Sequence, residues 1–227
     1  MHYLLIVFIL FGLLYGPQLW VKQVLNRYNR KDEENFPGTG GELARHLLDR
    51  FNLQHVKVEI TEQGDHYDPS TETVRLTADK HDGKTLTAIT VAAHECGHAM
   101  QHATKQPLFM WRTRLAHTTV LAERFGSFLL FAAPLLVLIS RAPAVGFVSA
   151  IGAFLVIGFG VLLQFLTLPV EIDASYRKAL PILKDGYLTE TQYPAAKRIL
   201  RAAAWTYVAA SLSSLFNFWR WMAVLRR

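Results

Sequence analysis

The chain has 227 residues, of which 51% are hydrophobic, and it carries a formal net charge of +6. A mean hydropathy of +0.17 is high for a soluble domain and low for a chain that lies wholly in lipid, so we expect one modest polar domain and several apolar spans. The basic balance favours contact with anionic lipid over nucleic acid, because no basic aromatic stripe or nucleic-acid motif accompanies it. A single cysteine, Cys96, excludes an internal disulfide and fits a reducing compartment.

The first 21 residues form an apolar segment that predicts a transmembrane anchor. A bilayer crossing needs roughly 20 apolar residues, which this segment supplies. It has neither a basic start nor a small-residue cleavage site, so we expect it to be retained rather than cleaved. Residues 22–38 are charged and end in proline and glycine, which is typical of a linker.

Residues 39–124 are expected to form the first part of a small α+β catalytic domain. Thr39 and Glu42 have the spacing of a helix capping box. A helix should therefore begin there and run to about residue 52, with its leucines on one face.

Two strands and a second helix are expected to follow. The stretch "VKVEI" at 56–60 alternates apolar and polar residues, as a half-buried strand does. The stretch "DHYDPSTETVRLT" predicts extended chain, a turn around residues 68–70 and a second strand that ends near residue 77. We expect a further helix over about residues 85–104.

Two uncharged runs, 125–139 and 144–168, lie on either side of a short "SRAP" turn. They predict a transmembrane hairpin over residues 125–168. The polar and basic residues 169–201 follow, and then an apolar C-terminal segment, 202–227, that either spans the membrane or lies at its interface. Lysines and arginines cluster beside most of the expected span ends, which predicts a multi-pass plasma-membrane protein with its catalytic domain on the cytoplasmic side.

The stretch "HECGH" carries the clearest chemical signal. On a helix, His94 and His98 share one face and can hold one tetrahedral zinc ion. Glu95 is rotated by about 100° from His94, so it can act as general base on a metal-bound water without ligating the metal. The alternative is a pair of core histidines bonded to backbone carbonyls, and the glutamate between them favours the metal site.

The third metal ligand has to come from elsewhere in the chain. His102 continues the same helix face, but it lies about 12 Å from His94 along the helix axis, too far to share the ion. Thr104 occupies the position at which a metzincin would need its third histidine, which excludes that class.

Two carboxylates in "LPVEIDAS", Glu171 and Asp173, follow the expected hairpin on the same side as the histidines. An acid so close to a membrane span is costly unless it has a role. The alternative for both is an interfacial ion pair with Arg177 or Lys178, and the residues alone leave the choice open.

Two further roles have weaker candidates. Zincins bind substrate along an exposed strand, and "DHYD" or "TVRLT" could be that edge. His66 and Tyr67 would then contact substrate, or they would be turn and packing residues. A tetrahedral oxyanion also needs a donor, for which Tyr207, His117 and Arg177 are candidates, although each could be structural.

These segments together resemble the bacterial neutral zinc metallopeptidase family of the YugP type. The resemblance rests on "DHYDPSTETVRLT", "AAHECGHAMQH", the apolar hairpin, "LPVEIDASYRKAL" and "AAAWTYVAASL", and it covers nearly the whole chain. The family is similar in plan to the heat-shock membrane protease HtpX and to the CAAX prenyl proteases, which are gluzincins.

The resemblance implies a mainly α, zincin-like α+β domain with a small sheet, interrupted and anchored by transmembrane helices. It also implies one Zn²⁺ bound by His94, His98 and Glu171. Ser175 stands where those relatives have an aspartate that would orient a ligand, so Asp173 becomes a candidate for that task.

The sequence therefore predicts a membrane-anchored, zinc-dependent endopeptidase acting on membrane or membrane-proximal proteins. Its expected partners are the lipid bilayer and protein or peptide substrates, and not nucleic acid. The alternative from another class is a non-catalytic metal-binding membrane scaffold or transporter. Gln164 and Thr167 are the main polar groups of the third apolar run, which makes a poor ion path.

Overall fold

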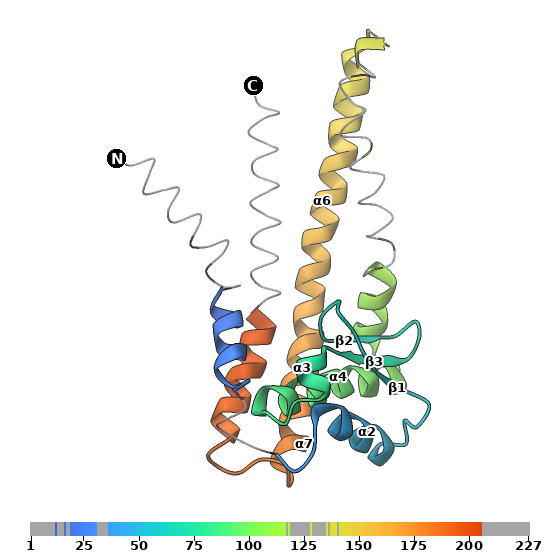
Figure 1. The fold of residues 1–227 in the computed structure, drawn as a ribbon. Helices are drawn as coiled ribbons and strands as arrows, with labels where there is room; N and C mark the ends of the chain where they lie inside the picture. The colour runs from blue at the N-terminus through green and yellow to red at the C-terminus, as the bar shows by residue number, and fades with distance from the viewer. Residues whose placement is uncertain are drawn as a thin grey trace, which may run out of the picture.

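A helical body with one small sheet carries a long projecting helix, α6 (Figure 1). The computed structural model describes residues 12, 16, 19–30, 36–116, 118, 128, 135, 137–139 and 141–205. Its labelled elements are α2 (Gly40–Arg50), β1 (Lys57–Ile60), β2 (His66–Asp68), β3 (Thr73–Leu76), α3 (Ala78–His81), α4 (Leu86–Ala103), α6 (Pro143–Ile172), the π-helical η1 (Asp173–Ala179) and α7 (Leu180–Lys184). Residues 19–27, 107–116 and 193–205 are also helical. Among the described residues, no helix is both long enough and apolar enough to cross a membrane.

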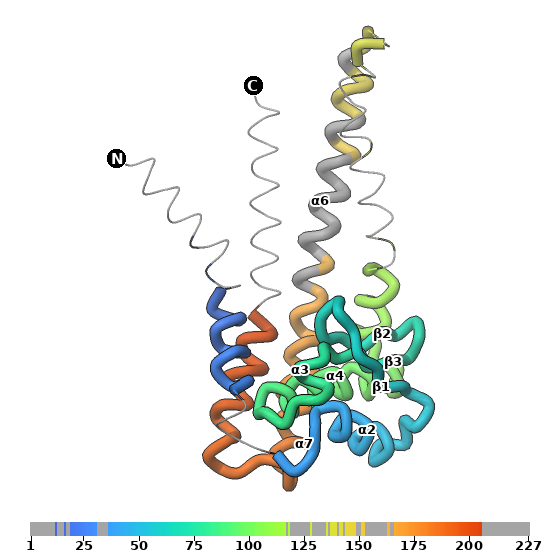
Figure 2. Tube along the Cα trace, viewed as in Figure 1, coloured from blue at the N-terminus to red at the C-terminus, as the bar shows by residue number. Residues whose placement is uncertain are grey.

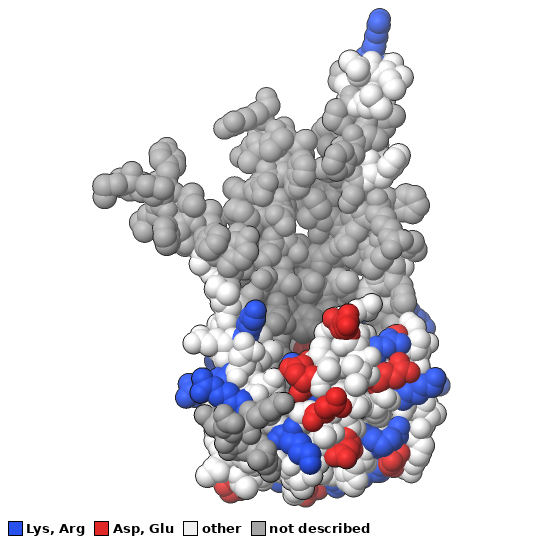
Figure 3. Space-filling view, in the orientation of Figure 1, with Lys and Arg blue, Asp and Glu red and all other residues white. Residues whose placement is uncertain are grey.

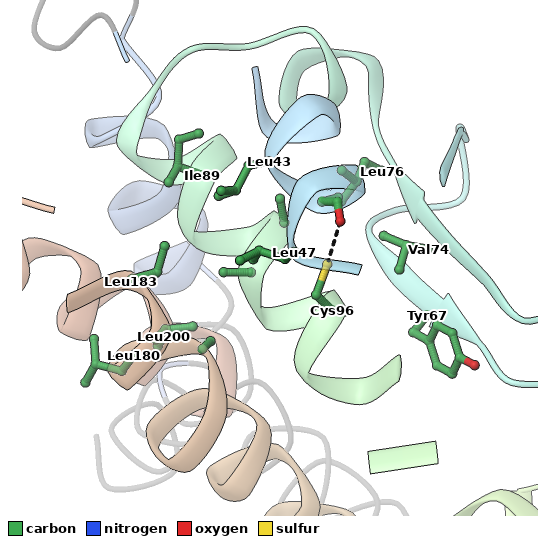
Figure 4. Packing of buried hydrophobic residues seen from close by; sticks show 14 of the residues in the cluster. Leu43, Leu47, Tyr67, Val74, Leu76, Ile89, Cys96, Leu180, Leu183 and Leu200 are labelled. Carbon is green, nitrogen blue, oxygen red and sulfur yellow. Dashed lines mark hydrogen bonds between the residues drawn. The ribbon is translucent and has the colours of Figure 1, made fainter. Parts of the chain in front are cut away.

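Helix α2 begins at the predicted capping box. The Thr39 hydroxyl accepts from the Glu42 amide at 3.1 Å, and the Glu42 carboxylate accepts from the Thr39 amide at 2.8 Å. Each contact satisfies an amide that the helix itself leaves unpaired. One face of α2 buries Leu43 and Leu47 against α4, as Figure 4 shows.

The sheet has the order β1-β3-β2, with β1 parallel and β2 antiparallel to β3. Val74 in β3 pairs with Val58 of β1 on one side and with Tyr67 of β2 on the other, which gives the register of all three strands. Val74 and Leu76 are fully buried and pack toward α4 (Figure 4). The predicted strands are confirmed, and the preceding extended chain, β2, is a third strand of the same sheet.

Helix α4 is the centre of the body. Of its 18 residues, 14 are buried, because α2, α3, the sheet, η1 and α7 all contact it. A helix that is buried on most sides needs small residues where its neighbours come close, and α4 has alanine, glycine and cysteine there. Cys96 packs into this core and donates to the Ala44 carbonyl at 3.6 Å (Figure 4).

Helix α6 runs without interruption from Pro143 to Ile172 and passes directly into η1. Residue 168, where the expected hairpin ends, therefore lies within this helix, and Glu171 lies in its last turn. In Figure 2 the lower end of α6 enters the body beside α4. The helix thereby delivers the residues at its C-terminal end to the centre of the body.

The N-terminal part of the expected linker is helical. Residues 19–27 form helix, and Val21 and Val24 are buried in the core. Burial of this apolar face explains why the helix continues through charged sequence. The Tyr28 hydroxyl accepts from Arg198 at 3.1 Å, which joins this helix to the helical residues 193–205.

Most of the other expected apolar segments lie outside the described residues. This applies to nearly all of residues 1–18, to most of residues 117–140 and to residues 206–227. On the face shown in Figure 3, the described charged side chains gather over the body, with acidic and basic groups intermixed.

Gly97 permits the close approach of α4 to η1. A Cβ at this position would lie 3.0 Å from the Ala174 carbonyl oxygen and 3.4 Å from its Cα. We expect Gly97→Val to lower the free energy of unfolding by about 1–3 kcal/mol, because its larger side chain would overpack this contact. The measurement is the thermal or urea unfolding of the purified protein.

The matched control is Ala103→Val, at an exposed position of the same helix. Its cost should be only the helix propensity of valine, about 0.6 kcal/mol or less. Equal destabilisation by the two variants would contradict the close-approach account.

Candidate metal centre

His94 and His98 project from one face of α4 toward the last turn of α6. Their rings lie edge to face with centroids 4.7 Å apart. The Nε2 atoms of both histidines face the same oxygen, Oε2 of Glu171, at 3.1 Å from His94 and 3.3 Å from His98. The structure therefore brings together two imidazoles and one carboxylate that are 77 and 73 residues apart in sequence.

Glu171 is a buried carboxylate with only 1% of its side chain exposed. Burial alone would raise its pKa, but the nearby His98 and the hydrogen bonds from His94 and His98 hold the pKa well below the usual value. Its second oxygen, Oε1, is buried and has no hydrogen-bond donor among the described residues. A buried carboxylate costs several kcal/mol unless positive charge or donors compensate for it, so this one indicates a functional arrangement.

The three donor atoms fit a zinc ion. One ligand atom from each of the three residues lies within 4.8 Å of the others. Two ligands at about 2.0–2.1 Å from a tetrahedral zinc are about 3.3 Å apart, which matches the 3.1 and 3.3 Å contacts to Oε2. Two imidazoles and one carboxylate form the donor set of catalytic zinc sites that leave a fourth position for water.

The second ring nitrogen, Nδ1, of each histidine also has a hydrogen-bond partner. The Ser175 hydroxyl lies 3.1 Å from Nδ1 of His94, and Oε1 of Gln101 lies 2.9 Å from Nδ1 of His98. Partners on Nδ1 hold an imidazole ring so that Nε2 faces the metal. Asp173, a candidate for orienting a histidine, accepts from Gln101 at 2.9 Å and has no direct hydrogen bond with either histidine among the described residues.

Glu95 is 6% exposed and lies next to the two histidines. Its pKa is raised to about 7, chiefly by burial and further by the charges of Glu171 and Asp65, while His94 and Arg112 oppose the rise. A carboxyl group with a pKa near neutrality, beside a metal centre, suits proton transfer.

Helical residues 107–116 cover the other side of the site. Phe109 is 1% exposed, and its ring lies 6.1 Å from that of His98 and 5.7 Å from that of His102. Arg112, three residues further along and hence on the same helix face, places Nη2 3.5 Å from the unbonded Oε1 of Glu171. The helix therefore presents both an apolar wall and a cation to the site.

Two stretches were candidates for the edge strand that binds substrate, and only one of them lies at an edge of the described sheet. Strand β3 is the middle strand of the sheet, so "TVRLT" cannot be a substrate edge. Strand β2 lies at one edge of the described sheet. Tyr67 on β2 is buried, and its hydroxyl bonds Nδ1 of His102 at 2.9 Å, whereas His66 is half-buried with Nδ1 2.8 Å from the Gly64 carbonyl. Both therefore have packing or turn contacts.

Of the three suggested oxyanion donors, the structure describes only Arg177. Arg177 is exposed, and within the described part of the chain it has no ion pair or hydrogen bond with the histidines or with Glu171. Tyr207 and His117 lie outside the described residues.

Gln101 and Arg112 are the site residues that sequence reasoning missed. Gln101 falls three residues after His98, on the buried face of the same helix, and this spacing is a signal that could have identified it. No local pattern identifies Arg112, because its position depends on the tertiary packing of residues 107–116 on α4.

Comparisons with known proteins identify the family of this chain. A family described as "Putative neutral zinc metallopeptidase" matches residues 3–226. The chain is 34% identical over 222 residues to the "Putative membrane protease YugP" of Bacillus subtilis (strain 168), covering 94% of this chain and 92% of that protein. No solved structure matches the chain. On the family match and this identity, the chain belongs to the neutral zinc metallopeptidase family.

Proposed function

We propose that the protein is a zinc-dependent endopeptidase of gluzincin type. The observation that carries the proposal is the convergence of both Nε2 atoms on one oxygen of a buried, ionised carboxylate. His94, His98 and Glu171 would hold a single zinc ion. When bound, the ion would lower the pKa of its water to about 7 and polarise the substrate carbonyl.

Glu95 would be the general base. It follows His94 directly, so its side chain points in a different direction around the helix from the two histidines. Glu95 therefore lies beside the metal ligands and is not one of them. Burial keeps water from hydrating its carboxylate, and the resulting pKa of about 7 lets it accept a proton from water and return it to the leaving amine.

The outer edge of β2 would bind the substrate backbone. The negative charge of Asp65, directly before β2, contributes to the raised pKa of Glu95. The hydroxyl of Tyr67 on β2 bonds His102, which lies one helical turn beyond His98. Strand β2 therefore follows α4 past the site, and an extended peptide added to its edge would pass the general base.

Arg112 would stabilise the negative charge that develops on the carbonyl oxygen. It is 27% exposed, its charge reaches both Glu171 and Glu95, and it faces an oxygen that has no hydrogen-bond donor. A fixed cation at a largely dry site stabilises a developing oxyanion more strongly than it would in water.

Membrane anchoring is part of the proposal. It is supported by the uncharged runs in the sequence and by the name of the Bacillus relative, a putative membrane protease. The excess of Lys and Arg beside these runs would place the catalytic body on the cytoplasmic side of the plasma membrane. The bilayer would then limit the substrates to membrane or membrane-proximal proteins.

Zinc content tests the ligand assignment. We expect about one zinc per wild-type chain, and less than about a tenth of that in His94→Ala and Glu171→Ala, because each variant removes one of three protein ligands. The measurement is metal analysis by mass spectrometry. The control is His46→Ala, whose imidazole bonds Tyr187 away from the site. Wild-type zinc content in Glu171→Ala would refute this ligand set.

Replacement of the general base tests the enzymatic part of the proposal. Glu95→Gln should keep its zinc and lose about 10²- to 10⁴-fold in kcat on an unstructured peptide, because an amide cannot accept the proton. Peptide cleavage at the wild-type rate by a zinc-loaded Glu95→Gln protein would rule out this mechanism. Metal uptake into vesicles by the same variant would favour the transporter alternative.

The proposed role of Arg112 predicts a loss of kcat without a loss of zinc. Arg112→Gln should lower kcat by about 10²- to 10³-fold with little change in zinc content, and Arg112→Lys should recover part of the loss. Steady-state kinetics beside zinc analysis separates the two effects. An Arg112→Gln protein with unchanged kcat would show that another group supplies the donor.

A further inference from the structure

Gln101 is a fully buried amide whose hydrogen bonds connect a metal ligand to another element. Its exposed fraction is 0%. Oε1 lies 2.9 Å from Nδ1 of His98, while Nε2 donates to the Val170 carbonyl and to Asp173, both at 2.9 Å. Every polar atom of this side chain is therefore used in a place where an unpaired one would cost about 1–3 kcal/mol.

The partners of Gln101 determine which way its amide points. The Val170 carbonyl cannot donate, so the atom that faces it at 2.9 Å has to be Nε2 of the NH₂ group, and the same Nε2 lies 2.9 Å from an oxygen of Asp173. Lys178 and Gln106 also place nitrogen atoms 3.0 Å from that Asp173 oxygen. The remaining atom, Oε1, must therefore face His98.

The amide in turn determines the tautomer of His98. A carbonyl oxygen can only accept, so Nδ1 of His98 donates to Oε1 of Gln101, and Nε2 is the nitrogen left for Glu171 or a metal. Nε2 faces Glu171 at 3.3 Å, on the side that a zinc ion would occupy. The hydroxyl of Ser175 can donate or accept, so it leaves the tautomer of His94 open.

We infer that Asp173 and Gln101 form a positioning relay for His98, in which the carboxylate orients the amide and the amide fixes the protonated nitrogen of the imidazole. The inference rests on the proposed zinc site and names the residues that prepare one of its ligands. Outer-shell partners of this kind affect metal affinity by about 10- to 100-fold.

The relay also joins His98 to the segment that carries the third ligand. Val170 and Asp173 flank Glu171 closely on either side, at the junction of α6 and η1. Asp173 is itself held by Gln106 at 3.0 Å and by Lys178 at 3.0 Å. Displacement of α6 from α4 would therefore remove Glu171 and release His98 together.

The test is zinc affinity, measured by competition with a chromogenic chelator, for four variants of the full chain. Gln101→Leu removes the acceptor and should weaken zinc binding by about 10- to 100-fold. Gln101→Glu keeps an acceptor for His98, but it sets a carboxylate oxygen against Asp173 and the Val170 carbonyl, so it should also bind weakly. Adding Asp173→Asn to Gln101→Glu supplies an NH₂ donor and should recover at least part of the affinity. The control is Gln54→Leu, because Gln54 is exposed and, in the described part of the chain, its side chain donates to the Asp49 carbonyl and contacts no residue of the site; this variant should bind zinc as wild type does.

The Co²⁺-substituted proteins give a second readout. The visible d–d spectrum reports the ligand field, so Gln101→Leu should alter it and the double variant should restore it toward wild type, which a purely structural role would not produce. Wild-type zinc affinity in Gln101→Leu, or a double variant that binds no better than Gln101→Glu alone, would overturn the relay while leaving the zinc site intact. A wild-type protein that binds no zinc would overturn the zinc site and the relay together.

Discussion

The contact of His94 and His98 with Glu171 is the interaction on which the rest of the structure depends. A carboxylate that is 1% exposed cannot remain ionised without compensating charge, and the structure surrounds it with two imidazoles and, at 3.5 Å, the guanidinium of Arg112. These groups come from α4, from residues 107–116 shortly after it, and from the end of α6, which is remote in sequence. The site therefore exists only when α4, the end of α6 and residues 107–116 are packed together.

The packing around α4 is arranged to allow this meeting. Gly97 leaves room for the Ala174 backbone, and that approach brings Ser175 to His94 and Asp173 to Gln101. The change from α- to π-helix at residue 173 follows Glu171 immediately. Such π-helical turns are rare and occur often at functional sites, where they re-aim side chains. Here Glu171, Asp173 and Ser175 each contribute to the site from one short stretch of chain.

The sequence predicted the parts of the site that are local. The spacing of His94 and His98 on one helix face, the capping box at Thr39 and the two main strands follow from short-range periodicity, which the structure reproduces. Glu171 and Asp173 could only be offered as alternatives from the residues, because their distance from α4 is set by tertiary packing. The same reason explains why β3 was a poor candidate for a substrate edge: strand order is not visible in the strand's own residues. The expected apolar run ends at residue 168, whereas the helix continues to Ile172, so hydropathy alone does not indicate where the helix ends.

The most direct test of the central claim is the coordination shell of the bound metal, measured by zinc-edge X-ray absorption on the purified full-length protein. The account predicts two imidazole nitrogens and two oxygens, one from Glu171 and one from water, at about 2.0–2.1 Å. A sulfur ligand at about 2.3 Å, which would have to come from Cys96, or a shell without imidazole scattering, would contradict it.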